Sequence, residues 1–307
     1  MNRELSKISM RVYPKTIYTD IVGMPDPILL GITVHYYNHS DVNLYMKMFI
    51  DGPSPWSSNA VELGLLNSGS NTYINLDNFT SRTKPASATT EALTLTLRGY
   101  SDAGYSILLY EFTRSLTVVF IKSDDGSWTT DFLNNFDGGT VEGWDIQTVL
   151  DGGLSPTRAI ATDYLLSTPY SLKGDGYSNW NGNPQTTWGQ QLKILNDANE
   201  LVHLGLGALI QGAATGIPRN KWMRIVVPLP VNTTFTLKIF VGGAWTNANY
   251  TKTMSFQLFK NFTTPNKTTV YAIINIRINY GGIHFTPPEA AQGSIYIWLD
   301  DFKIISK

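Results

Sequence analysis

The chain has 307 residues, no cysteine and a net charge of −1 at pH 7. Without cysteine it has no disulfides, thiolate metal sites or cysteine nucleophiles, and its balanced charge provides no basic surface for nucleic acid or an anionic membrane. Charged residues make up only 15% of the chain, against roughly 25% in an average soluble protein. A polar but uncharged surface of this kind favours an extracellular, cell-surface or virion-surface protein over a cytosolic enzyme.

The length indicates about two domains. The run Lys122–Ser127 (KSDDGS) combines charge, turn residues and little apolar content, so we expect one domain over residues 1–126 and a second over 127–307. No segment reaches the roughly 18–20 apolar residues of a membrane span. The first residues lack the apolar core of a signal peptide. We therefore expect either a cleaved signal or another route to the protein's location, such as assembly into a virus particle.

The first domain alternates between apolar and polar residues. Leu93–Arg98 (LTLTLR) places leucines on one face and polar side chains on the other, which is typical of a half-buried antiparallel strand. The polar run Thr80–Thr90 predicts a loop. Turn-rich segments separate further predicted strands over residues 28–37, 44–49, 61–66, 71–76, 106–113 and 116–122.

Seven or eight short strands in about 120 residues are typical of a β-sandwich. The segment Asp102–Tyr105 (DAGY) opens a predicted strand. It resembles the Gly-Tyr entry to the penultimate strand of immunoglobulin-like domains. The resemblance implies an immunoglobulin-like shape for the first domain.

The second domain also consists of short predicted strands between Gly-rich and Asn-rich loops. The segment Asn199–Ala214 comes closest to a helical pattern, but its glycines would weaken a helix by roughly 1 kcal/mol each, so we expect strand and loop there. The remaining strands are predicted over residues 144–149, 186–195, 222–229, 235–241, 254–259, 270–279 and 294–305.

Three groups of residues in this domain follow one another in a recognisable order. They are Phe136-Asp137-Gly138-Gly139 with Gly143-Trp144, then Tyr170–Gly174 (YSLKG) with Trp180-Asn181-Gly182, and last the strand Ile295–Ile304 (IYIWLDDFKI). In this order they resemble the motifs of the jelly-roll, galactose-binding-like carbohydrate-binding modules that accompany xylanases and related glycosidases. The resemblance implies an all-β chain in which a C-terminal jelly-roll β-sandwich follows an N-terminal Ig-like β-sandwich.

The resemblance also implies a structural calcium ion. In the family, an acid near the first strand and one in the final strand often bind calcium, and Asp137, Asp300 and Asp301 are the matching residues. Calcium takes six to eight hard oxygen ligands, which carboxylates and backbone carbonyls supply. Asp137 stands where glutamate is usual, so its carboxylate reaches less far. The alternative is that Asp137 caps a turn, while Asp300 and Asp301 form the polar end of an apolar strand.

The match to the family's tryptophan loop makes Trp180 the first candidate for a ligand contact, with Tyr177, Asn181 and Trp188 beside it. An aromatic ring on an exposed loop can stack on the apolar face of a sugar ring, and an amide can hydrogen-bond its hydroxyl groups. The alternative is that Trp180 covers one end of the sandwich core. Trp245 is predicted at a hairpin tip, where it would serve either a ligand or a protein interface.

Nothing in the sequence predicts catalysis. Acid–base and nucleophilic catalysis need a positioned pair of groups, and the carboxylates of the second domain form no recognised pair. There is no nucleophile elbow and no phosphate-binding loop. The histidines lie in separate regions and form no metal-ligand set; they are His35, His39, His203 and His284.

Two functions for a non-enzymatic protein remain open at this point. The first is a glycan-binding or adhesion protein whose jelly roll binds the glycan and whose N-terminal domain is a spacer. The second is a structural subunit of a virion (capsid, turret or spike), or of a cell-surface layer or filament, in which exposed aromatic residues contact neighbouring subunits of a homo-oligomer. An accessory region of a larger glycosidase is a third interpretation.

Overall fold

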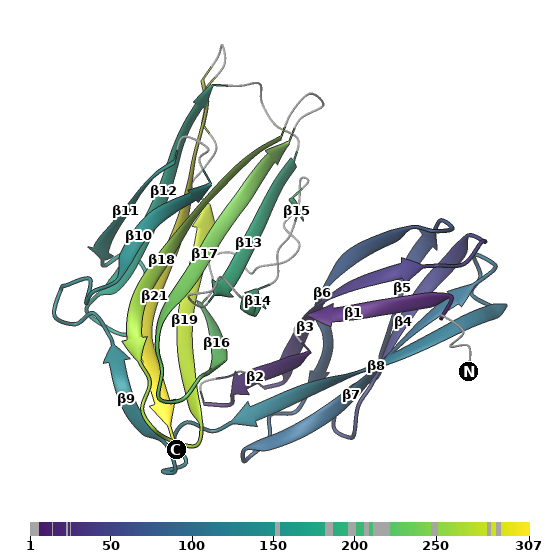
Figure 1. The fold of residues 1–307 in the computed structure, drawn as a ribbon, viewed down its shortest axis with the longest axis horizontal. Helices are drawn as coiled ribbons and strands as arrows, with labels where there is room; N and C mark the ends of the chain where they lie inside the picture. Colours follow the sequence, from purple (N-terminus) through teal and green to yellow (C-terminus); the bar gives the residue numbers. More distant parts are fainter. Residues whose placement is uncertain are drawn as a thin grey trace. The chain divides into compact units, whose positions relative to one another are not determined.

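The computed structural model describes residues 6–13, 15–22, 24, 26–150, 154–181, 187–195, 201–205, 209–210, 222–246, 251–280, 284–286 and 290–307. Every regular element within these residues is a β-strand, so the fold class is all-β, as predicted. The same residues include no helix long and apolar enough to cross a membrane. The chain divides into two compact units, Met1–Lys122 and Ser123–Lys307, whose strands are labelled in Figure 1.

The N-terminal unit contains two sheets. The three-stranded sheet has the order β1 (Ile8–Tyr13), β3 (Ile28–Asn38) and β6 (Asn71–Arg82). The five-stranded sheet has the order β2 (Thr16–Asp20), β8 (Leu108–Ile121), β7 (Thr89–Tyr100), β4 (Leu44–Asp51) and β5 (Asn59–Leu66). β2 runs parallel to β8, whereas the other neighbouring strands run antiparallel.

Alternation along the strands builds the core between these two sheets. In β4, Leu44, Met46, Met48 and Ile50 are buried and the residues between them are partly exposed. Successive side chains of a strand point to opposite faces of a sheet, so one face of β4 packs on the core. The three-stranded sheet adds buried residues to the same cluster, among them Ile32.

The C-terminal unit also has two sheets, both antiparallel throughout. The seven-stranded sheet contains β11 (Leu154–Ala161), β12 (Ser171–Asn181), β21 (Ala290–Ser306), β19 (Val270–Tyr280) and β16 (Trp222–Leu229) in that order, and β9 (Thr129–Asn134) and β20 (His284–Thr286) also pair with β21. The six-stranded sheet contains β10 (Asp145–Leu150), β18 (Thr251–Thr263), β17 (Thr234–Thr246), β13 (Thr187–Leu195) and β14 (Leu201–Gly205), with β15 (Leu209–Ile210) on β13.

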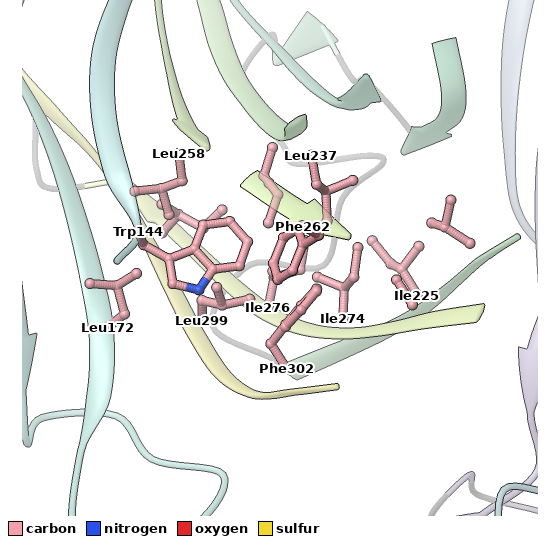
Figure 2. Packing of buried hydrophobic residues seen from close by; sticks show 14 of the residues in the cluster. Trp144, Leu172, Ile225, Leu237, Leu258, Phe262, Ile274, Ile276, Leu299 and Phe302 are labelled. Carbon is pink, nitrogen blue, oxygen red and sulfur yellow. The ribbon is translucent and has the colours of Figure 1, made fainter. Parts of the chain in front are cut away.

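Aromatic rings pack among aliphatic side chains in the core of the C-terminal unit, as Figure 2 shows. The ring centroids of Phe262 and Phe302 lie 5.1 Å apart, and Trp144 meets Phe302 edge-on at 5.3 Å. Aromatic pairs prefer such offset and edge-on arrangements. Phe262 comes from the six-stranded sheet and Phe302 from the seven-stranded sheet, so these contacts join the two layers.

A buried amide also links the two layers. Asn134, at the end of β9, accepts through Oδ1 from Trp144 Nε1 (3.0 Å) and from Lys260 Nζ in β18 (2.9 Å). Its Nδ2 donates to the Glu142 carboxylate, which also accepts from the backbone N–H of Phe136. Burial lowers the pKa of Lys260 below its ordinary value, and the charge of Glu142 opposes that shift.

The segment that leads from β9 to β10 has an unusual backbone. Phe136 and Glu142 have φ values of +60° and +47°, in a region that residues other than glycine rarely adopt. Each residue held in this region costs on the order of 1–3 kcal/mol of folding free energy. The buried Phe136 ring and the hydrogen bonds of Glu142 hold the segment in this shape.

Several predicted boundaries in the N-terminal unit are wrong. Residues 106–113 and 116–122 are not two strands, because β8 pairs continuously with β7 from Leu108 onward. The predicted loop 80–90 is shorter than expected. β6 continues to Arg82, because its last residues still pair with Ile28 and the residues after it in β3, and β7 already begins at Thr89. The largely buried Arg82 also forms an ion pair with Glu91 at 2.5 Å. The segment Asp102–Tyr105 precedes the last strand of the unit and not the penultimate one.

We expect Asn134→Ala to lower the free energy of unfolding of the C-terminal unit by about 2–3 kcal/mol, because it leaves the buried Trp144 Nε1 without its acceptor. Urea denaturation followed by tryptophan fluorescence measures this effect. Asn135→Ala is the matched control, since within the described part of the chain the side-chain hydrogen bonds of Asn135 are to Asp137. Equal denaturation midpoints for the two variants would contradict the role given to Asn134.

Candidate functional site

The strand β21 presents different chemistry on its two faces. Ile297 and Leu299 are fully buried members of the core cluster. Trp298 and Asp300 alternate with them and therefore lie on the opposite face of the seven-stranded sheet. Across the sheet, Trp298 pairs with Lys173 of β12 and with Arg277 of β19. This register gathers an aromatic ring and two cations on one side of the sheet.

A cluster of five side chains surrounds Trp298; we call Asp163, Tyr164, Lys173, Arg277, Tyr296 and Trp298 together the Trp298 cluster. Tyr164 meets Trp298 edge-on with ring centroids 4.8 Å apart, and Tyr296 lies 5.7 Å from it. Trp298 is only 1% exposed, so its neighbours, and not its own ring, form the accessible surface.

Charged groups complete the Trp298 cluster. Lys173 Nζ lies 4.6 Å from the ring centroid of Tyr296 and forms an ion pair with Asp163 at 3.4 Å. Asp163 also accepts a hydrogen bond from Trp298 Nε1 (2.9 Å). The Arg277 guanidinium lies 3.8 Å from the ring centroid of Tyr164. The exposed part of the cluster therefore offers cationic donors, a carboxylate acceptor and partly exposed aromatic surface.

The segment between β11 and β12 is attached to this face by Asp300. The backbone N–H groups of Leu166 and Ser167 donate to Asp300 Oδ2 at 2.8 and 2.9 Å, and the N–H of Asp301 donates to Oδ1 at 2.8 Å. Ser167 Oγ donates to both aspartates. Burial raises the pKa of Asp300 above its ordinary value. The backbone hydrogen bonds from Ser167 and Leu166 oppose this shift without cancelling it.

The three aspartates of the predicted calcium site are not brought together. Asp137 is exposed and bonds to Asn135, whereas the partly buried carboxylate of the opening motif belongs to Glu142. The described residues, which include all three aspartates, contain no group of three or more acidic or histidine side chains that could hold a metal ion. The lone pairs of Asp300 already accept from N–H and O–H donors. These residues therefore do not fit the predicted calcium ion.

The aromatic candidates fall on strands and not on an exposed loop. Tyr177, Trp180 and Asn181 belong to β12, where Trp180 pairs with Ala291 of β21. Trp188 belongs to β13 of the six-stranded sheet and pairs with Trp245. Their side chains lie outside what the structure describes. Regular pairing across β12 accounts for the difference from the expected loop, because the ladder with β21 continues through Asn181.

A second polar group lies on the three-stranded sheet of the N-terminal unit. Ser9 Oγ and His39 Nε2 are 2.8 Å apart, and Tyr37 Oη hydrogen-bonds His35 Nδ1 at the same distance. A serine nucleophile needs a histidine that a third group orients. The bond between Ser9 and His39 is exposed, and the hydrogen bonds described for His39 include none to a carboxylate.

Comparisons with known proteins yield distant structural matches only. No family model matches the sequence, and no curated protein matches it. A carbohydrate-binding module of the β-sandwich superfamily aligns over 99% of both chains with 10% identity and a TM-score of 0.22. The CBM22-1–CBM22-2 tandem domain from Paenibacillus barcinonensis Xyn10C covers 98% of this chain and 91% of its own (9% identity, TM-score 0.19).

The E. coli chaperone DraB also aligns, over 81% of this chain and 95% of its own, with 11% identity and a TM-score of 0.24. Two of these three matches are therefore carbohydrate-binding modules. TM-scores at this level establish no shared fold, so the functional interpretation of this chain depends on its own residues.

Sequence reasoning missed the Trp298 cluster. The one usable signal was the alternation of Tyr296, Trp298 and Asp300 with apolar neighbours in the last strand, which marks a second face with its own chemistry. The contributions of Asp163 and Tyr164 carried no such signal, because the segment that holds them is distant from β21 in sequence.

We expect Asp300→Ala to lower the free energy of unfolding by about 2–4 kcal/mol, because it leaves the backbone N–H groups of Leu166, Ser167 and Asp301 without their acceptor. Asp137→Ala is the matched control and should change it by less than about 0.5 kcal/mol, since Asp137 is exposed. Chemical denaturation of both variants measures the difference. If Asp137→Ala lowered the free energy of unfolding more than Asp300→Ala, the roles given to the two aspartates would be wrong.

Chelation is expected to leave Tm unchanged, because donors of the protein itself already satisfy Asp300. Thermal unfolding is recorded in EDTA and then after calcium is restored in excess, with magnesium at the same ionic strength as the control. A rise in Tm that calcium produces and magnesium does not would contradict the described geometry and restore the calcium prediction.

Proposed function

We propose that this chain is a non-enzymatic glycan-binding protein that acts at an extracellular, cell or virion surface and binds its ligand through the C-terminal unit. The observation that carries the proposal is the Trp298 cluster on the non-core face of the seven-stranded sheet. It combines a partly exposed tyrosine with fixed donors and acceptors, which suits a ligand that has apolar C–H faces and many hydroxyl groups.

The cluster supplies complementary groups for such a ligand. Lys173 and Arg277 donate hydrogen bonds and Asp163 accepts them, while Tyr296 provides aromatic surface. Internal contacts hold each of these groups: Asp163 bonds to Trp298 Nε1, and Arg277 packs on Tyr164. Groups that are already ordered lose little conformational freedom when a ligand binds.

Two of the residues that the family resemblance selected remain part of the proposed site. Tyr177 and Asn181 lie in β12 an even number of positions from Lys173, and therefore on the same face of the strand. Trp180 lies an odd number of positions from Lys173 and is a separate candidate position. The proposed site extends along this strand from the Trp298 cluster toward Asn181. Trp188 lies in the other sheet and belongs to a separate candidate position.

A structural subunit of a virion, cell-surface layer or filament is the second candidate function. The observation that favours it is the run of exposed apolar residues Ile107, Leu108 and Leu109 in the N-terminal unit. Exposed apolar runs of this kind often mark contacts between proteins.

We expect retention of the protein by at least one member of a polysaccharide panel in affinity electrophoresis. Tyr296→Ala and Lys173→Ala should weaken that retention about tenfold or more, because each removes a contact group from the ligand face. Tyr73→Ala is the control, since Tyr73 is an exposed tyrosine of the other unit.

Thermal unfolding of each variant separates lost binding from lost folding. Retention that survives both substitutions in folded protein would contradict the assignment to the Trp298 cluster, and Trp180→Ala then tests the other end of β12. No retention on any polysaccharide, together with large assemblies in light scattering, would favour the structural-subunit function.

A further inference from the structure

The five-stranded sheet of the N-terminal unit leaves part of one strand edge open. β8 pairs with β7 from Leu108 to Phe120, but β2 pairs with its other edge only from Thr117 to Ile121. For residues Leu108–Leu116 (LLYEFTRSL), the described part of the chain provides no strand partner on that side. Unpaired N–H and C=O groups of this kind are able to bind another strand.

The usual protection of a strand edge is weak in this segment. Proteins protect edges with proline, lysine or bulges. Leu108–Leu116 contains neither proline nor lysine, and its only register shift against β7 lies at the Leu108 end. The adjoining side chains of Ile107, Leu108 and Leu109 are 57%, 47% and 43% exposed. The open edge therefore joins an apolar surface.

We propose that this edge pairs antiparallel with the same edge of a second copy of the chain, which forms a two-fold dimer with a continuous sheet. Two-fold dimers are the commonest protein oligomers, and each copy contributes the same surface to the interface. The proposal concerns the N-terminal unit alone. It holds whether or not the C-terminal unit binds a glycan.

The ends of the open edge limit where the two-fold axis passes. An axis beyond Arg114 would place the second copy on residues that β2 already pairs. An axis close to Leu108 would place it on the turn that connects β7 to β8. An antiparallel pairing centred near the middle of the segment avoids both.

The charges of Glu111 and Arg114 favour some positions of the two-fold axis over others. An axis through Glu111 would set two carboxylates opposite each other, and one through Arg114 would set two guanidinium groups opposite each other, which is unfavourable. Axes through Phe112 or Thr113 avoid both pairings. They place Arg114 opposite an aromatic ring of the second copy, that of Tyr110 or Phe112, respectively. Within one copy, Arg114 already lies 4.7 Å from the ring centroid of Phe112, so its guanidinium is compatible with such a contact.

Edge pairing over so few residues buries a small area, so we expect a weak dimer. Light scattering of the full chain is measured up to about 100 µM, because small interfaces give weak association. The mass should rise from 34.1 kDa toward twice that value.

Thr113→Glu should weaken the dimer about tenfold, because the new carboxylate faces Glu111 of the second copy in one register and its own equivalent in the other. Thr94→Glu is the matched control. Thr94 is exposed and lies opposite Ser115, but on the interior strand β7, so this substitution should leave the mass unchanged. Circular dichroism verifies the fold of both variants.

A chain that stays monomeric throughout the concentration series overturns the proposal. A dimer that Thr113→Glu leaves intact, or that Thr94→Glu weakens equally, overturns it as well, because association would then use another surface. Loss of the dimer in Thr113→Glu alone supports pairing through β8.

Discussion

The C-terminal sandwich depends on the hydrogen bonds of Asn134. Its side chain belongs to the seven-stranded sheet, yet it accepts from Lys260 of the six-stranded sheet and from Trp144, which precedes β10. An apolar side chain at this position would leave the indole N–H of Trp144 buried without an acceptor. The same network helps to hold the segment whose backbone has positive φ values at Phe136 and Glu142.

On the non-core face of the seven-stranded sheet, the carboxylate of Asp300 has a comparable role. Asp300 is buried and holds backbone N–H groups of the segment between β11 and β12, and that segment brings Asp163 and Tyr164 to Trp298. Protein donors here occupy the oxygens that a metal ion would need. The Trp298 cluster is ordered by these bonds, and ordered polar groups with partial exposure are what ligand recognition requires.

Periodicity in the sequence predicts most strands of the second domain, because apolar alternation is a local signal. Trp222–Leu229 matches β16 in full. Pairing partners are not local, so the sequence could not show that Asp300 meets Leu166 and Ser167. An acid in a terminal strand is equally compatible with a metal ligand and with an acceptor of N–H bonds. For the same reason the sequence could not show that pairing with β3 extends β6 to Arg82, into a segment whose polar composition predicts a loop.

A dimer through β8 would change what the proposed glycan site could achieve. Single sites that rely on a few hydrogen bonds and one ring bind sugars modestly, because each polar contact replaces one with water. Two linked sites convert the second binding event into an intramolecular one and raise the apparent affinity without any new contact. That gain would require both C-terminal units to reach the same surface at once, so the segment that joins the two units would determine whether the proposed dimer strengthens the proposed glycan binding.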